Sequence, residues 1–187
     1  LTDTVIEYMS AQVEAGADLL QLFEAMGNFI EEEYFYKWAM PSMRRIATEL
    51  KARHPDIPLL VFPRGATYSL ATLQQAGFDV VTMDTMTARK GTRGVLQDAA
   101  VIESVQNPGS EPSVAGIQGN FDVAYLKEGA YAPEDVKEAV EKMLTELGPQ
   151  KLIANLGEGL TGKEDPVLVT AFVDAVHEVS EKLIKSS

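Results

Sequence analysis

The chain has 187 residues, of which 45% are hydrophobic and 24% are charged, and its formal net charge is −12. This composition is typical of a folded globular protein, and the negative charge argues against nucleic-acid binding. The absence of cysteine excludes disulfides and thiolate chemistry. No apolar run approaches the roughly twenty residues of a membrane span, so we expect no membrane association.

The chain begins with a pattern typical of a helix N-terminus. Residues 1–4 contain no initiator Met, and either Thr2 or Asp3 can cap a helix over 4–15. We therefore expect this sequence to be a piece of a longer protein or the product of processing.

One pattern occurs five times along the chain: an apolar strand-like run, a polar or glycine-containing loop, and an amphipathic helix. The predicted strands are 18–23, 58–62, 80–83, 114–118 and 152–156. The predicted helices are 4–15, 30–53 with an interruption before Pro41, 70–76, 88–96, 133–147 and 166–184. Strands that alternate with helices in this way indicate an α/β protein with a parallel sheet.

Two parallel architectures fit this pattern, an open doubly wound sheet and a (β/α)8 barrel. No Gly-x-Gly-x-x-Gly follows the first strand, which disfavours a nucleotide-binding sheet. Five strands are too few to close a barrel, because eight strands usually take about 250 residues. We expect 1–187 to be a single partial domain and 97–113, which contains Asn107-Pro108-Gly109, to be a surface loop insertion.

Each predicted strand ends near polar or glycine residues, which at one edge of a parallel sheet would line a pocket. The fifth strand is the most informative, because Glu158 follows it between Gly157 and Gly159. Capping of helix N-termini is the alternative role for such strand-end residues. Arg89, Lys90 and Arg93 form a basic cluster that we interpret as a solvated helix face, with contact to substrate carboxylates as the alternative.

Several segments together carry a family resemblance. They are Leu20-Gln21-Leu22-Phe23-Glu24, Lys37-Trp38-Ala39-Met40-Pro41, Gln75-Ala76-Gly77-Phe78-Asp79, Gln118-Gly119-Asn120-Phe121-Asp122, Ile153-Ala154-Asn155-Leu156-Gly157 and Ala171-Phe172-Val173-Asp174-Ala175-Val176-His177. Over nearly its whole length the chain resembles the C-terminal half of the uroporphyrinogen decarboxylase family.

This resemblance implies the C-terminal part of a (β/α)8 TIM barrel, about five parallel strands with flanking helices. It also implies a homodimeric lyase of porphyrin and heme biosynthesis that decarboxylates acetate side chains of uroporphyrinogen, a tetrapyrrole, with no cofactor and no metal. The family's ring-binding aspartate, paired arginines and tyrosine lie in an N-terminal half that this chain lacks. We expect the chain alone to be inactive, and a location in the cytoplasm, or in a plastid if the source is a photosynthetic eukaryote.

The resemblance also implies the substrate-binding positions, which are Phe23, Ala25, Gln118, Asn120 and Glu158. Two of these positions depart from the family pattern. Ala25 stands where the family has a serine, and Glu158 stands where it has a histidine that can donate to a substrate carboxylate. An anion at this position repels a polyanionic substrate, by roughly 1–4 kcal/mol for unit charges about 4 Å apart.

Other departures and two rival functions follow from the resemblance. Val123 replaces a proline, and segment 97–113 is longer than in the family.

A paralogue that binds a tetrapyrrole or a partner without catalysis is the first alternative function. A related methyltransferase with cobalamin or zinc is the second, and the absence of cysteine argues against it. A half-barrel would also expose its first and last strands, so we expect self-association or poor order there.

Overall fold

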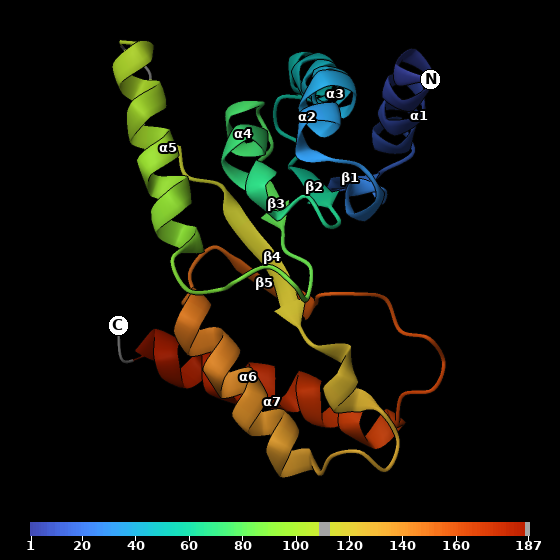
Figure 1. Ribbon diagram of the computed structural model, residues 1–187, viewed down its shortest axis with the longest axis vertical. Coiled ribbons are helices and arrows are strands. Elements are labelled where there is room, and N and C mark those ends of the chain that lie inside the picture. The colour runs from blue at the N-terminus through green and yellow to red at the C-terminus, as the bar shows by residue number, and fades with distance from the viewer. Residues whose placement is uncertain (109–112, 186–187) are drawn as a thin grey trace. The chain divides into compact units, whose positions relative to one another are not determined.

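A computed structural model describes residues 1–108 and 113–185 as helices alternating with parallel strands (Figure 1). The helices are α1 (Thr2–Glu14), α2 (Glu32–Tyr34), α3 (Met40–Arg53), α4 (Leu70–Gln75), α5 (Thr92–Gln106), α6 (Pro133–Leu147) and α7 (Pro166–Lys185). The strands are β1 (Leu20–Glu24), β2 (Leu59–Pro63), β3 (Val80–Thr82), β4 (Gly116–Phe121) and β5 (Leu152–Leu156). The predicted α/β class with five strands and flanking helices is confirmed.

The five strands form one sheet in the order β1-β2-β3-β4-β5. β1 pairs with β2, β2 with β3, and β4 with β5, each in parallel. Every residue of β4 is buried, as is typical of a parallel strand covered on both faces. Strands that follow one another in the chain are therefore neighbours in the sheet. This is the strand order expected of consecutive βα units of a (β/α)8 barrel.

The described chain divides into two compact units. The first contains Leu1–Thr82 and Gly94–Gly116, and the second contains Met83–Arg93 and Ile117–Ser187, although its last two residues lie outside the described part. No single linker separates the units, because the chain passes between them more than once. That 1–187 is a single partial domain stays a prediction.

The first unit is built around helices packed on β1 and β2. Ile6 of α1 and Ile46 of α3 are buried where these two helices pack together. The interruption expected before Pro41 is present as a π-helical turn, Phe35–Ala39. Pro41 has no N–H to donate to the preceding turn, and the helix widens there before α3 continues.

The second unit has a core between β4 and the helix pair α6 and α7, which pack against each other (Figure 1). Phe121 at the end of β4 lies against Phe172 of α7, with ring centroids 4.7 Å apart. Val140 and Leu144 of α6 are buried in the same unit. This packing fixes the end of β4, where the candidate site is found.

The helix predicted at 88–96 is confirmed over 92–96 but begins later and extends further, and the prediction of a loop at 97–113 was wrong over 97–106. α5 spans Thr92–Gln106, so residues 97–106 are helical, and residues 109–112 of the expected loop lie outside the described residues. Leu96, Ala99 and Ala100 recur at helical spacing and are buried. The helix continues to Gln106, directly before Asn107-Pro108, because a proline disfavours helical backbone only in the residue that precedes it.

Within the described residues, no helix is both long enough and apolar enough to span a membrane.

Candidate functional site

The loop after β3 is organised by a buried carboxylate. Asp84 is 3% exposed, and its Oδ1 accepts hydrogen bonds from the backbone N–H of Met86 at 3.1 Å and of Thr87 at 2.9 Å. The Thr87 hydroxyl donates to the same oxygen at 2.8 Å. The Asp84 side chain therefore stabilises the turn in its own loop by hydrogen bonds, as Asp commonly does in turns.

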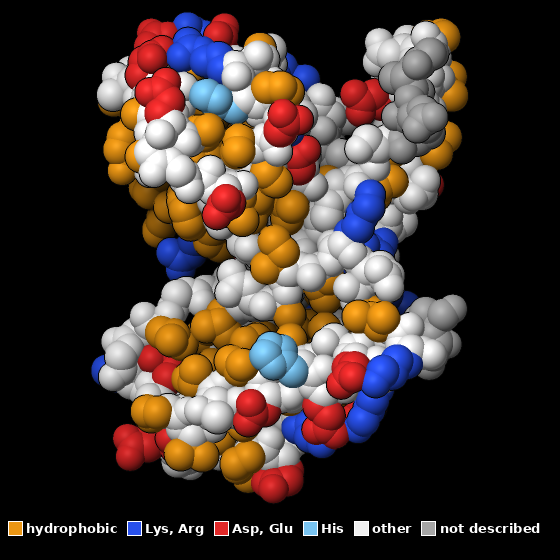
Figure 2. All heavy atoms as spheres, turned by 180° about the vertical axis from the view of Figure 1, so that it is seen from behind, with side chains coloured by type: hydrophobic (Ala, Val, Ile, Leu, Met, Phe, Trp, Pro, Cys, Tyr) orange, Lys and Arg blue, Asp and Glu red, His pale blue; other side chains and the backbone are white. Residues whose placement is uncertain are grey.

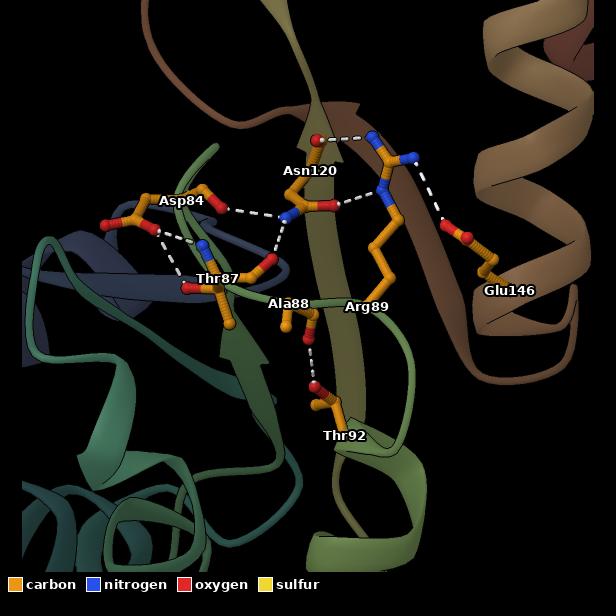
Figure 3. Close-up of polar contacts among 7 residues, drawn as sticks. All are labelled: Asp84, Thr87, Ala88, Arg89, Thr92, Asn120 and Glu146. Carbon is orange, nitrogen blue, oxygen red and sulfur yellow. Dashed lines mark hydrogen bonds and ion pairs between the residues drawn. The ribbon is translucent and has the colours of Figure 1, made fainter.

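Asn120, one of the expected substrate-binding residues, lies inside β4 and joins this loop to the strand (Figure 3). It is 1% exposed, and its Nδ2 donates to the carbonyls of Asp84 and Thr87, both at 2.8 Å. Its Oδ1 accepts a hydrogen bond from Arg89 Nε at 2.8 Å. All three hydrogen-bonding groups of the amide are thus used within the protein.

The basic cluster is not a solvated helix face. Arg89 lies before α5 and contacts Asn120, and its Nη1 forms an ion pair with Glu146 Oε2 at 3.4 Å. Arg93 donates to the carbonyls of Leu147, Gly148 and Gln150, and so satisfies the free carbonyls at the end of α6. Lys90 is exposed. In this part of the chain, two of the three cations bind protein groups.

The turn after β5 packs against the loop after β3. A Cβ at Gly157 would lie 2.5 Å from the backbone N of Thr85 and 2.5 Å from its Oγ1. The Thr85 hydroxyl is buried and makes no hydrogen bond. Gly157 therefore permits a close approach of two loops of the same unit, whereas a Cβ at Gly159 would meet nothing within 4 Å.

Replacing Gly157 by Ala is expected to lower the free energy of unfolding by about 1–3 kcal/mol, because the backbone of Thr85 must move. Gly159→Ala is the matched control in the same turn and should change stability by less than about 0.5 kcal/mol. Urea denaturation of both variants measures the difference. Equal stabilities would show that the two loops do not pack as described.

The other two expected residues of the second unit are Gln118 and Glu158. Gln118 is buried in β4, and its carbonyl accepts a hydrogen bond from Met83 N at 2.8 Å. Glu158 is half-buried in the bend after β5 and interacts with other protein groups. Further along, Glu164 accepts hydrogen bonds from the backbone N–H of Thr161, which lower its pKa to about 2.

In the first unit, the end of β1 presents an aromatic ring and a carboxylate. Phe23 is 66% exposed, and its ring meets the edge of Phe62 on β2. Glu24 Oε1 accepts a hydrogen bond from Met26 N, while Glu24 Oε2 is buried without a hydrogen bond. Ala25 follows and is exposed.

Tyr68 lies in the same unit and was not identified from the sequence. Its ring packs edge-on against Phe35, and its hydroxyl is buried without a hydrogen bond. Burial raises the pKa of Tyr68, with smaller contributions from the charges of Glu32 and Glu24, so the hydroxyl is a donor at neutral pH. No sequence motif marks this tyrosine, because only the packing of the π-helical turn Phe35–Ala39 against the turn after β2 places it there.

The chemistry available to these residues is that of binding and proton transfer. Among residues 1–108 and 113–185 there is no group of three or more His, Asp or Glu side chains that could hold a metal ion. At the carboxyl ends of its strands, the first unit presents the exposed ring of Phe23, and the second unit presents the half-buried carboxylate of Glu158. Each unit by itself can offer polar and apolar contacts to an organic ligand.

The parallel sheet, with polar groups at its strand ends, defines an α/β protein built from βα units. A family model described as uroporphyrinogen decarboxylase (URO-D) matches residues 1–179. The chain belongs to the uroporphyrinogen decarboxylase family.

Curated relatives agree with this assignment. The chain is 37% identical over 183 residues to a uroporphyrinogen decarboxylase of Salinibacter ruber, covering 97% of this chain and 46% of that protein. It is 36% identical over 189 residues to that of Homo sapiens, covering 98% of this chain and 46% of the relative. For Dictyostelium discoideum the identity is 31% over 186 residues, with 98% and 46% covered. The chain thus spans about half the length of the curated relatives it matches.

Proposed function

We propose that this chain supplies the C-terminal part of a uroporphyrinogen decarboxylase-type carboxy-lyase of tetrapyrrole biosynthesis. The observation that carries the proposal is the family match over residues 1–179. The relatives are about twice as long as this chain, so the proposal includes an N-terminal half that completes the barrel. β1 and β5 stand at the two ends of the strand order, where such a half would add its strands.

The proposed reaction requires no cofactor. Protonation of a pyrrole ring turns it into an electron sink, and the C–C bond to the acetate carboxylate then breaks with release of CO2. The electron pair of that bond passes into the ring and leaves a methylene group on it. A proton delivered to the methylene carbon then completes a methyl group, and loss of the first proton restores the neutral pyrrole. Fixed dipoles and charges at the site contribute by stabilising the cationic ring more than the neutral one.

The residues of this chain are proposed to bind rather than to react. Phe23 offers an exposed apolar ring for a pyrrole face, and Gln118 lies in the buried strand β4. Asn120 is proposed to hold the loop after β3, because its amide is already bonded to protein groups. Ala25 and Glu158 are proposed to face the substrate without the hydroxyl and the histidine of the family pattern.

These last two residues favour a second candidate, a paralogue that binds a tetrapyrrole or a partner without catalysis. Glu158 adds a negative charge where a polyanionic substrate would bind, and Ala25 removes a donor. Both changes are expected to weaken the binding of a polyanionic substrate.

An assay with uroporphyrinogen separates these candidates. The 187-residue chain is expected to release no CO2, and a protein that joins it to the N-terminal half of a relative is expected to do so. Robust turnover by the chain alone would contradict the need for a second half. Porphyrin binding without turnover by the joined protein would favour the non-catalytic candidate.

We also propose that the complete protein is a homodimer. Large hydrophobic side chains are exposed between β1 and α3, notably Phe29 at 74% and Trp38 at 68%. Hydrophobic side chains also gather on the face of the first unit shown in Figure 2. Exposed patches of this kind commonly mark protein interfaces. Sedimentation of the joined protein and of its Trp38→Glu variant tests this, and a monodisperse monomer of the unsubstituted joined protein over a wide range of concentrations would contradict it.

A cytoplasmic location stays a prediction, which microscopy of a fluorescently tagged protein in its source organism can test.

A further inference from the structure

Arg89 occupies a central place in the polar network of the second unit (Figure 3). Its Nε donates to Asn120 Oδ1 at 2.8 Å, and its Nη2 donates to the Asn120 carbonyl at 3.2 Å. Its Nη1 forms the ion pair with Glu146 of α6. One planar guanidinium thus joins the loop before α5 to the strand β4 and to the helix α6.

The amide of Asn120 is oriented by this arrangement. Two carbonyls, those of Asp84 and Thr87, face its nitrogen, and one N–H of Arg89 faces its oxygen. Turning the amide over would place its NH2 group against the N–H of Arg89 and its oxygen against both carbonyls. The hydrogen-bond pattern therefore assigns a single orientation, in which Arg89 is the donor to Asn120 Oδ1.

We propose that Arg89 is a positioning residue of the candidate site, which acts through Asn120 to hold the loop after β3 against β4. The proposal deepens the proposed function and rests on it for the identity of the ligand. Arg89 does not bind substrate carboxylates in this role, because its donors contact Asn120 and Glu146. It fixes the segment that carries Thr85 and Met86 instead.

This segment lies where a ligand would meet it. Met86 is 80% exposed, while the backbone on either side of it is bound to Asp84 and Asn120. Thr85 contacts Gly157, next to Glu158. Loss of Arg89 would leave the buried oxygen of Asn120 without its donor, and the amide could then turn and release the loop.

Arg93 offers a matched control. It is an arginine of the same segment and also binds the second unit, but its partners are the carbonyls of Leu147, Gly148 and Gln150 at the end of α6. Substituting it disturbs the packing of α6 without touching Asn120. A general loss of stability would therefore weaken ligand binding in the variants of both arginines, whereas loss of the positioning role would weaken it only in the variants of Arg89.

The experiment compares Arg89→Met, Arg89→Lys and Arg93→Met in the 187-residue chain. NMR measures hydrogen exchange of the Asn120 side-chain amide, and absorbance titration measures the Kd for uroporphyrin. We expect Arg89→Met to speed amide exchange at least tenfold and to raise the Kd about tenfold. Arg89→Lys should recover part of both effects, and Arg93→Met should change each by less than twofold.

Unchanged amide exchange in Arg89→Met would overturn the proposal, as would an equal rise in Kd for Arg93→Met. Faster exchange with an unchanged Kd would overturn the link to the ligand site. If the unmodified chain binds no uroporphyrin, the proposed ligand fails for this chain. The exchange of the Asn120 amide and of the Thr87 backbone N–H then decides whether Arg89 holds the loop.

Discussion

Replacing Asn120 by Asp is expected to lower the free energy of unfolding by about 2–6 kcal/mol, because two buried carbonyls lose their donor at about 1–3 kcal/mol each. The carbonyls are those of Asp84 and Thr87, and the new carboxylate would face both. The side chain at this position is 1% exposed, so water cannot replace the lost donors. Chemical denaturation measures the change.

The matched control is Asn155→Asp. Asn155 is the register partner of Asn120 on β5, but its side chain is exposed. The same change of amide to carboxylate should alter stability there by less than about 0.5 kcal/mol. If Asn120→Asp is tolerated as well as Asn155→Asp, the amide does not hold the loop after β3.

Replacing Glu158 by Gln or His is expected to tighten uroporphyrin binding. Removal of a repulsion of roughly 1–4 kcal/mol between unit charges about 4 Å apart corresponds to a gain of about fivefold to several hundredfold in affinity. Glu158 is half-buried at the turn after β5, where the field of a carboxylate is less screened than on an open surface. Absorbance titration of the 187-residue chain gives the Kd.

A second carboxylate separates the local effect from the net charge. Glu181 is exposed on α7 and pairs with Lys185, so Glu181→Gln makes the same change in charge away from any strand end. Its Kd for uroporphyrin should stay within about twofold of the unmodified chain, because surface charges are screened by salt. Equal effects of the two substitutions, or none from Glu158, would show that Glu158 does not face the ligand.

Some elements were predictable from local pattern alone. α6 begins at Pro133 and ends at Leu147, as predicted, because proline favours a helix start and Gly148 takes a positive φ of 71° after its end. β5 was predicted with the correct bounds from its apolar run. α5 was not, because the Pro and Gly residues near position 108 predict a loop over residues that are helical up to Gln106.

In the candidate site, too, some features were predictable from the sequence and others were not. The polar residues at the strand ends, Asn120 and Glu158 among them, were identified from their positions after apolar runs and from the family resemblance. The partners of these residues were not predictable. Arg89 and Asn120 are 31 residues apart in the chain, and Arg89 and Glu146 are 57 apart.

By itself the sequence determined the class of this protein and its family. The burial pattern of a helix or strand and the residues of a turn involve only residues close together in the chain, and the motifs of a family are contiguous segments. Only the tertiary structure decided that Arg89 and Arg93 bind protein groups, that Gly157 makes room for Thr85, and that Asn120 is fully bonded. These outcomes depend on which loops the sheet brings together, and a hydrogen bond or a close contact between distant segments leaves no periodic signal in the chain.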